Sequence, residues 1–367
     1  MEKIFYVAFS SIPSSLPSSL QIIKTCEKLS KLSHDVTLVK PGTGNKKISI
    51  KKYYGLKNNI KVKQFSSINS FPQGLNFYLY CFYCLFFISK EKKSITITRN
   101  YFMCYLLLLF KKETILEIHT DTNIEGRLTK FILRYFNFLN NKNLKRIVAI
   151  SYAVKNLFIK KYYVNEKKII VLPSGSSIRV NKLPNFCFKK KLKIGYFGSL
   201  SFSKGIQTII NLSKIDSKNE YFIYGGENKD LRKLRLKNTN KNLFLKKSIP
   251  YTMVPKKMME MDILTLPYTK VIKSAGEVDD ISSYTSPLKL FDYLAVGKII
   301  LSSNLKVLRE IINEKNAYFI NDYENIFEWK KVINIIQNNK IKNIILSRNN
   351  YKLSKKYDHE TRVKYYI

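Results

Sequence analysis

The stretch SPLKLFDYLAVGKIILSSN, residues 286–304, begins like an apolar helix and ends like a buried strand. Ser286 is a good N-cap and Pro287 is a good first helical residue, so the sequence predicts a helix over 287–296. A β-branched, apolar strand over 298–303 follows after a single glycine stop. A helix that leads straight into a strand is typical of an α/β protein with a parallel sheet.

The same alternation extends along the chain. The N-terminal residues predict a strand at 3–9, a Ser/Pro-rich loop, a helix to about residue 33 and a strand at 35–40, which together form a βαβ unit. The further predicted strands are 94–99, 114–119, 146–151, 192–198, 220–224, 243–246, 262–266 and 317–320, and the further predicted helices are 204–214, 254–261, 305–313 and the segment from about 322.

A chain of 367 residues is long for one core and suits two domains. We expect two doubly wound, Rossmann-like domains, 1–184 and 185–345, because the polar, lysine-rich segment 181–191 has few periodic apolar positions. The C-terminal segment 346–367 is predicted to be helical and to pack back on the N-terminal domain. Two such domains leave a central cleft at the carboxyl ends of their strands, where ligands of these folds bind.

The formal net charge of +39 leaves three interpretations open. A nucleic acid is one partner that a strong positive field attracts. An anionic membrane surface is another. The basic residues are mostly Lys, with about ten Arg, and they are spread along the chain. This spread favours a solvated lysine coat and argues against nucleic-acid binding.

Five cysteines, an odd number without a secretion signal, predict reduced thiols in a cytoplasmic protein. Cys81 and Cys84 form a C-x-x-C inside an apolar helical run, where core packing is favoured over redox or metal chemistry because no second Cys or His pair lies nearby. The other three cysteines are Cys26, Cys104 and Cys187.

Two apolar runs, 75–88 and 101–110, are the most hydrophobic segments of the chain. Both are shorter than the roughly 18 to 20 residues that span a bilayer. Buried helices are therefore favoured, and a helix that lies on a membrane is the alternative.

A candidate anion site lies in GYFGSLSFSKGIQTII, 195–210. The predicted strand ends at Gly198, and a helix opens near Lys204, so backbone N–H groups and the positive end of a helix dipole converge there. A diphosphate is the anion that best suits this site, with Lys204 as its counter-charge. Many βα loops carry a glycine and a lysine without binding an anion.

Residues 286–304 supply a second candidate contact with phosphate, because the first-turn N–H groups of the predicted helix are free. Leu288, Phe291, Leu294 and Ala295 form the predicted buried stripe, which leaves Lys289 and Asp292 one turn apart on another face. Asp292 could accept hydrogen bonds from the vicinal hydroxyls of a ribose. The alternative is an ordinary Lys–Asp surface pair.

These stretches together resemble the donor half of the family 4 (group 1) glycosyltransferases, retaining nucleotide-sugar enzymes with the GT-B fold. The resemblance rests on the Lys-Gly that opens the helix after Gly198, on the Pro-Lys-acidic-aromatic-Ala-Gly run of 287–297 and on Glu310. VLPSGSS (171–177), IVAISYAVKNLFI (147–159) and the N-terminal βαβ with its His34-Asp35 pair resemble further family segments. The resemblance covers nearly the whole chain.

The resemblance implies a role for each matching residue. Lys204 would neutralise the donor diphosphate, and the backbone from Gly198 to Ser199 and from Ser286 through Pro287 to Leu288 would contact the same phosphates. Asp292, where the family usually has Glu, would bind the ribose. Residues Lys247 to Pro250, with Ile249 and Pro250 among them, would lie beside the base.

On the side of the transferred sugar and the acceptor, the resemblance implies a role for His119 at the end of the strand 114–119. The alternative is a histidine that is satisfied at a strand end. Ser10, Ser11 and Arg99 are the candidate residues on the acceptor side.

Two positions depart from the family pattern. Many members carry a second acidic residue where this chain has Tyr284, and Glu277, Asp279 or Asp280 could substitute for it. The usual basic residue after the strand glycine is Ser199. Lys289 is our hypothesis for the missing charge.

The sequence therefore predicts a metal-independent hexosyltransferase without a cofactor, which moves a sugar with retention from a nucleoside diphosphate sugar to a saccharide or lipid-linked acceptor. The acceptor would belong to cell-surface polysaccharide, lipopolysaccharide or glycolipid synthesis. We expect a cytoplasmic protein that is peripheral on the inner face of the membrane and binds no nucleic acid. The alternatives are a nucleotide-sugar epimerase on the same fold and a basic membrane-binding or nucleic-acid-binding protein without catalysis.

Overall fold

The computed structural model describes residues 2–42, 49–66, 73–122, 125–184, 191–274 and 280–367. The chain divides into two compact units. The first unit contains Met1–Ser174 and His359–Ile367, and the second contains Gly175–Asp358. The boundary predicted at 184/185 lies downstream of this division. Within the predicted terminal segment, residues up to 358 belong to the second unit, and the nine after them return to the first.

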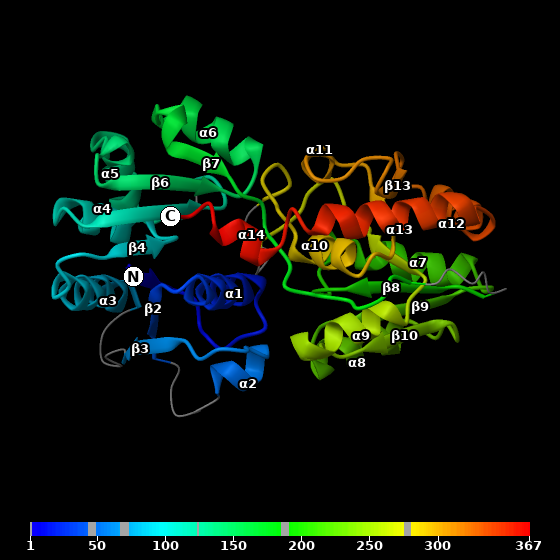
Figure 1. Ribbon diagram of the computed structural model, residues 1–367. Coiled ribbons are helices and arrows are strands. Elements are labelled where there is room, and N and C mark those ends of the chain that lie inside the picture. Colours follow the sequence, from blue (N-terminus) through cyan, green and yellow to red (C-terminus); the bar gives the residue numbers. More distant parts are fainter. Residues whose placement is uncertain (1, 43–48, 67–72, 123–124, 185–190, 275–279) are drawn as a thin grey trace. The chain divides into compact units, whose positions relative to one another are not determined.

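The first unit is built on a seven-stranded parallel sheet of order β3-β2-β1-β4-β5-β6-β7 (Figure 1). Its strands are β1 (Lys3–Val7), β2 (Asp35–Pro41), β3 (Lys61–Phe65), β4 (Ile95–Thr98), β5 (Glu113–Ile118), β6 (Leu144–Ala149) and β7 (Ile169–Val171). Its helices are α1 (Pro17–Lys31), α2 (Ile50–Tyr54), α3 (Gln73–Ser89), α4 (Tyr101–Leu109), α5 (Arg127–Tyr135), α6 (Tyr152–Tyr162) and α14 (His359–Val363).

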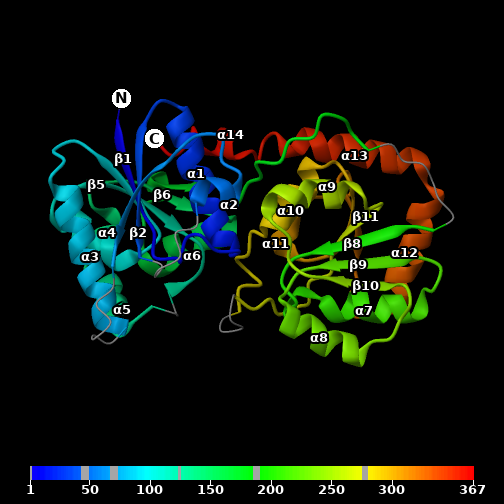
Figure 2. The ribbon, with the colours of Figure 1, turned by 90° about the horizontal axis from the view of Figure 1, so that it is seen from below.

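Helices cover both faces of the first sheet. In Figure 2, α1 and α14 lie on one face, and α3, α4 and α5 lie on the opposite face. α14 packs on α1, and Val363 and Tyr366 are buried in the same core as residues of β1 and β2. The C-terminal residues therefore complete the core of the first unit.

The second unit contains a six-stranded parallel sheet of order β10-β9-β8-β11-β12-β13. Its strands are β8 (Lys193–Phe197), β9 (Glu220–Tyr224), β10 (Leu243–Lys246), β11 (Ile263–Leu266), β12 (Ile299–Ser303) and β13 (Ala317–Ile320). Its helices are α7 (Ile206–Ile215), α8 (Asn228–Lys237), α9 (Val254–Met259), α10 (Leu288–Ala295), α11 (Lys306–Arg309), α12 (Ile326–Asn338) and α13 (Lys340–Ser354).

Two buried clusters, one on each face, hold the second sheet. One contains α10 with Leu264, Leu266 and Ile300, and the other contains α7 and α12 with Ile263 and Leu301. Neighbouring residues of β11 and β12 thus point to opposite faces, as the pleat of a strand requires. This explains the continuous apolar runs of both strands.

The helix predicted over 287–296 begins one residue later than expected. Leu288 is its first residue, and Pro287 occupies the N-cap without a side-chain cap hydrogen bond. The expected stripe is also wrong in part, because Asp292 and Tyr293 are buried together with Leu294. The helix is packed on more than one side, so a single apolar stripe does not describe it.

The four cysteines in the described part of the chain, Cys26, Cys81, Cys84 and Cys104, are free and buried. This confirms the core-packing interpretation of the C-x-x-C in α3. Cys187 lies outside the described residues. Among the described helices, none is long and apolar enough to cross a membrane.

Candidate functional site

Lys289, in the first turn of α10, has a buried ammonium group. Its Nζ lies 4.0 Å from the ring centroid of Tyr196 and 4.5 Å from that of Tyr268. Within the described part of the chain, this Nζ is buried without a hydrogen-bond partner. The alternative of an exposed Lys–Asp surface pair is therefore wrong. Burying an ammonium group without a hydrogen-bond partner is energetically unfavourable. A bound ligand that accepts a hydrogen bond from Lys289 would account for this burial.

The ammonium lies beside the glycine that ends β8. Gly198 has a φ of +152°, and a Cβ built there would lie 3.5 Å from Lys289 Nζ. Burial, and then the charge of Lys204, lower the pKa of Lys289 well below its usual value. Two cations therefore converge on one strand end, and an anion bound there would relieve the repulsion between them.

The turn that carries Lys204 fits only glycine at the next position. Lys204 ends a short 3₁₀ helix, and Gly205 follows with a φ of +78°. A Cβ on Gly205 would lie 1.5 Å from the carbonyl oxygen of Pro267, after β11. The sequence analysis predicted that a helix opens at Lys204-Gly205. The structure shows why glycine follows the lysine there, because any side chain would collide with the backbone of Pro267.

Asp292 lies one turn after Lys289 and is buried. Its Oδ1 accepts hydrogen bonds from Ser176 Oγ, at 2.6 Å, and from Tyr251 OH, at 3.0 Å. Burial raises the pKa of Asp292 to about 7, although both hydroxyl groups favour the ionised form. The carboxylate is therefore poised between its two protonation states near neutral pH, and hydroxyl groups already surround it.

The structure brings most of the predicted donor residues together within the second unit. Ile249 and Pro250 directly precede Tyr251, which joins them to Asp292. The carbonyl of Ser199 accepts a hydrogen bond from the hydroxyl of Tyr196, at 2.8 Å, and the same ring contacts Lys289. Lys289 therefore contacts the residues at the end of β8, and Asp292, one turn later on α10, contacts the residue after Pro250.

The alternatives for a second acidic residue near Tyr284 are only partly described. Asp280 is exposed, and its carboxylate accepts hydrogen bonds from the backbone and side chain of Ser282. Glu277 and Asp279 lie outside the described residues. The carboxylate of Asp280 is thus hydrogen-bonded within its own turn, and no described contact joins it to Asp292.

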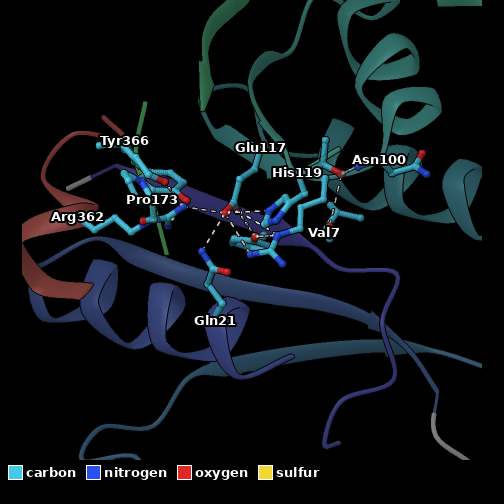
Figure 3. Close-up of polar contacts among 12 residues, drawn as sticks. Val7, Gln21, Asn100, Glu117, His119, Pro173, Arg362 and Tyr366 are labelled. Carbon is cyan, nitrogen blue, oxygen red and sulfur yellow. Dashed lines mark hydrogen bonds and ion pairs between the residues drawn. The ribbon is translucent and has the colours of Figure 1, made fainter. Parts of the chain in front are cut away.

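The first unit contains a buried ionic cluster around Glu117 of β5, shown in Figure 3. Glu117 is fully buried and receives Arg99 Nε at 3.1 Å, Arg362 Nη2 at 2.9 Å and Tyr6 OH at 2.7 Å. Gln21 of α1 is a further, longer contact at 3.4 Å. Burial alone would raise the pKa of Glu117, but the two guanidinium groups outweigh it and hold that pKa well below its usual value.

His119 is attached to this cluster. Its Nε2 lies 3.3 Å from Glu117 Oε1, and 28% of its side chain remains exposed. Removal from solvent and the charge of Arg99 lower the pKa of His119 to about 4, against the opposing effect of Glu117. The imidazole is therefore neutral near pH 7 and suited to hydrogen bonding with a sugar hydroxyl.

The three residues expected on the acceptor side have different surroundings. Arg99 is bound to Glu117 and to Tyr6, so its charge is already compensated within the unit. Ser10 and Ser11 follow β1, and the carbonyl of Ser11 accepts a hydrogen bond from Ser19 Oγ at 3.1 Å. No described contact joins these serines to Arg99.

The sequence analysis missed several residues that surround Lys289, Asp292 and Glu117. For some of these residues, the sequence contained a pattern that could have indicated them. Ser176 lies inside the quoted segment 171–177. Glu117 is an acidic residue in an otherwise apolar strand, a pattern that predicts a buried partner. Tyr196 and Tyr268 carried no such signal, since aromatic residues at strand ends usually fill the core.

Comparison with known proteins shows the fold. Anabaena Alr3699/HepE, in complex with UDP and glucose, is 13% identical with a TM-score of 0.72, and the match covers 100% of this chain and 98% of that one. Sucrose-phosphate synthase from Thermosynechococcus elongatus is 10% identical with a TM-score of 0.73, covering 100% and 97%. The chain has the GT-B fold.

A third similar structure is the lipopolysaccharide outer core galactosyltransferase WaaB, which is 14% identical with a TM-score of 0.66 and a coverage of 99% of this chain and 97% of that one. No family model and no curated protein matches the sequence. The predicted pair of Rossmann-like domains is thus confirmed at the level of the fold. A fold alone does not establish a function, so the function of this GT-B protein is inferred from the site residues described above.

Proposed function

We propose that this GT-B protein transfers a glycosyl group from a nucleoside diphosphate sugar to an acceptor hydroxyl. The observation that carries the proposal is the buried Lys289 ammonium, which lies beside Gly198 and near Lys204 without a hydrogen-bond partner among the described residues. Two cations at a strand end are suited to a diphosphate, which presents two negative groups in the same small space.

Each group of the site would have a separate task. Lys204, Lys289 and the first N–H groups of α10 would hold the diphosphate, because charges and helix N-termini stabilise anions. Asp292 would accept hydrogen bonds from the ribose hydroxyls in place of, or beside, those of Ser176 and Tyr251. His119 would donate a hydrogen bond to the transferred sugar.

The proposed reaction retains the configuration of the anomeric carbon. The bond from that carbon to the diphosphate oxygen breaks, and the acceptor oxygen forms a new bond on the same face of the sugar. The acceptor proton goes to the departing diphosphate oxygen. The cations at Gly198 would stabilise the negative charge that develops on the leaving group. We propose a hexosyl donor and no requirement for a divalent cation or a cofactor.

The first test is a thermal-shift panel of UDP-, GDP- and ADP-sugars, since a ligand that binds only the folded state raises Tm. UDP is the first choice, because the HepE structure contains UDP and glucose. The expected result is a rise in Tm with one nucleotide family, unchanged by EDTA. No shift with any nucleotide, together with salt-dependent binding to DNA, would refute the proposal.

Turnover separates the transferase from an epimerase on the same fold. A labelled donor is incubated alone and then with acceptors. A transferase consumes the donor productively only with an acceptor, whereas an epimerase converts it alone. We propose a saccharide or lipid-linked acceptor of cell-surface polysaccharide, lipopolysaccharide or glycolipid synthesis, supported by the basic charge of the chain and by the apolar surface described next.

A further inference from the structure

Large apolar side chains lie exposed on the helical layer formed by α3, α4 and α5 in the first unit. We call this the aromatic surface and define it by six residues. They are Phe82, Phe86, Phe110, Phe131, Tyr135 and Phe136. Phe86 is 67% exposed and Tyr135 is 64% exposed. Exposed apolar residues are normal when scattered singly, but a group on one layer indicates an interaction site.

The three helices form a continuous layer on one face of the sheet. α3 packs on α4 through the rings of Tyr78 and Phe102, whose centroids are 4.9 Å apart. Lys112, after α4, also donates to the carbonyl of Glu91, after α3, at 2.8 Å. α4 packs on α5 through Tyr105 and Phe136, at 5.5 Å. Both views place the three helices on the same side of the unit (Figures 1 and 2).

The sequence of α5, RLTKFILRY, divides its circumference into three stripes. Thr129, Ile132 and Leu133 are buried against the unit. Leu128, Phe131 and Tyr135 form an exposed apolar stripe, because residues three and seven apart share a face. The basic stripe contains Arg127, Lys130 and Arg134, which are also exposed. Six of the nine residues of α5 are therefore exposed and either apolar or basic, and none of the nine is acidic.

Positive charge lies beside the aromatic rings at the end of α3 and on α5. Lys90 Nζ lies 4.7 Å from the ring centroid of Phe86 at the end of α3, and the guanidinium of Arg134 lies 5.6 Å from that of Tyr135. Glu125, just before α5, interacts electrostatically with Lys130, and two further acidic residues at the ends of the layer are paired. Glu91 pairs with Lys3, and Glu113 pairs with a lysine of β6.

We propose that the aromatic surface docks on an anionic phospholipid bilayer. Apolar rings that lie among Arg and Lys side chains are suited to the boundary between acyl chains and headgroups. Anionic headgroups complement the basic stripe of α5. A nucleic acid would use the charges but leave the apolar stripe exposed to water. This inference extends the proposed transferase, and its test requires no catalysis.

The test is co-sedimentation of the full chain with vesicles of phosphatidylcholine alone or mixed with phosphatidylglycerol. We expect binding only to the mixed vesicles. Each basic residue near an anionic surface contributes about fivefold. The triple variant R127Q/K130Q/R134Q should therefore bind about 100-fold more weakly, and F131S/Y135S should also lose most of its binding. All five side chains are exposed, so the fold should persist, which circular dichroism checks.

A matched control comes from α8 of the second unit, where Arg232, Lys233 and Lys237 are exposed and Leu236 is 78% exposed. R232Q/K233Q/K237Q removes the same charge, and Leu236→Ser removes an exposed apolar group. Both should bind vesicles as the unchanged protein does. The proposal is overturned if the charge variants of α5 and α8 weaken binding equally, if F131S/Y135S binds normally, or if the protein binds RNA but not mixed vesicles. Because donor binding is measured separately, failure here leaves the proposed transferase standing.

Discussion

Replacing Lys289 by methionine separates the cost of a buried charge from its use in binding. Methionine keeps an unbranched stem between Tyr196 and Tyr268 but removes the ammonium. The ligand-free protein would lose two cation–π contacts of about 1 kcal/mol each. It would also be relieved of a desolvation penalty of several kcal/mol. We therefore expect the free energy of unfolding to rise by about 2 kcal/mol.

The affinity for nucleotide should change in the opposite direction. A hydrogen bond from a buried ammonium to phosphate contributes up to about 3 kcal/mol, so the Kd for UDP, or for the nucleotide that the panel selects, should increase about 150-fold. Urea denaturation without ligand gives the first quantity, and calorimetric titration gives the second. Lys331→Met is the control, since Lys331 is exposed on α12 and its loss changes the net charge equally.

The pH dependence supplies an independent check on this reasoning. The pKa of Lys289 is lower in the folded protein than its usual value of 10.5, so around this group the unfolded chain binds more protons than the folded state. The contribution of Lys289 to stability therefore rises with pH until the pH passes 10.5. Lys289→Met should lose this dependence, whereas Lys331→Met should keep it. A fall in stability together with an unchanged Kd would show that Lys289 only packs, and would refute the anion site.

Three further substitutions test the remaining features. The pKa of Asp292 is raised from 3.8 to about 7, so the folded state binds more protons than the unfolded chain between these pH values. The free energy of unfolding should therefore fall by up to about 4 kcal/mol as pH rises from 4 to 7. Asp292→Asn should flatten this pH dependence in urea titrations and should weaken nucleotide binding. Arg362→Met should lower the free energy of unfolding by about 3 to 5 kcal/mol, because Glu117 loses a buried partner; recovery in the double variant with Glu117→Gln checks this cause. Gly205→Ala should cost at least about 2 kcal/mol and weaken nucleotide binding through Lys204, and a stable variant with normal affinity would contradict the steric argument.

The sheets were largely predictable because their signal is local. β9, β10 and β13 match the predicted ranges, since each is a short apolar run that is bounded by polar residues. β3 was missed because it is exposed and contains alternating lysines, as edge strands often do. α8 was missed because its sequence, NKDLRKLRLK, is charged on most of its circumference.

A residue of the candidate site was predictable only where the residues that determine its surroundings lie in the same short segment of the sequence. The Lys204-Gly205 turn is of this kind, and the start of α10 was predicted to within one residue. The burial of Lys289 depends on Tyr196 of β8 and on Tyr268, which follows β11, so no pattern within α10 indicates it. The pairing of Glu117 with Arg362 spans 245 positions and was equally hidden.

The position of residues 359–367 has a consequence for biosynthesis. Arg99, after β4, and Glu117, on β5, leave the ribosome early, but Arg362 and Tyr366 follow only after the entire second unit has been made. Domains usually fold one after another during synthesis, beginning at the N-terminus. Here the first unit cannot close its ionic cluster until residues 359–367 emerge. A chain that stops before residue 359 should therefore contain a less stable first unit than the full chain does.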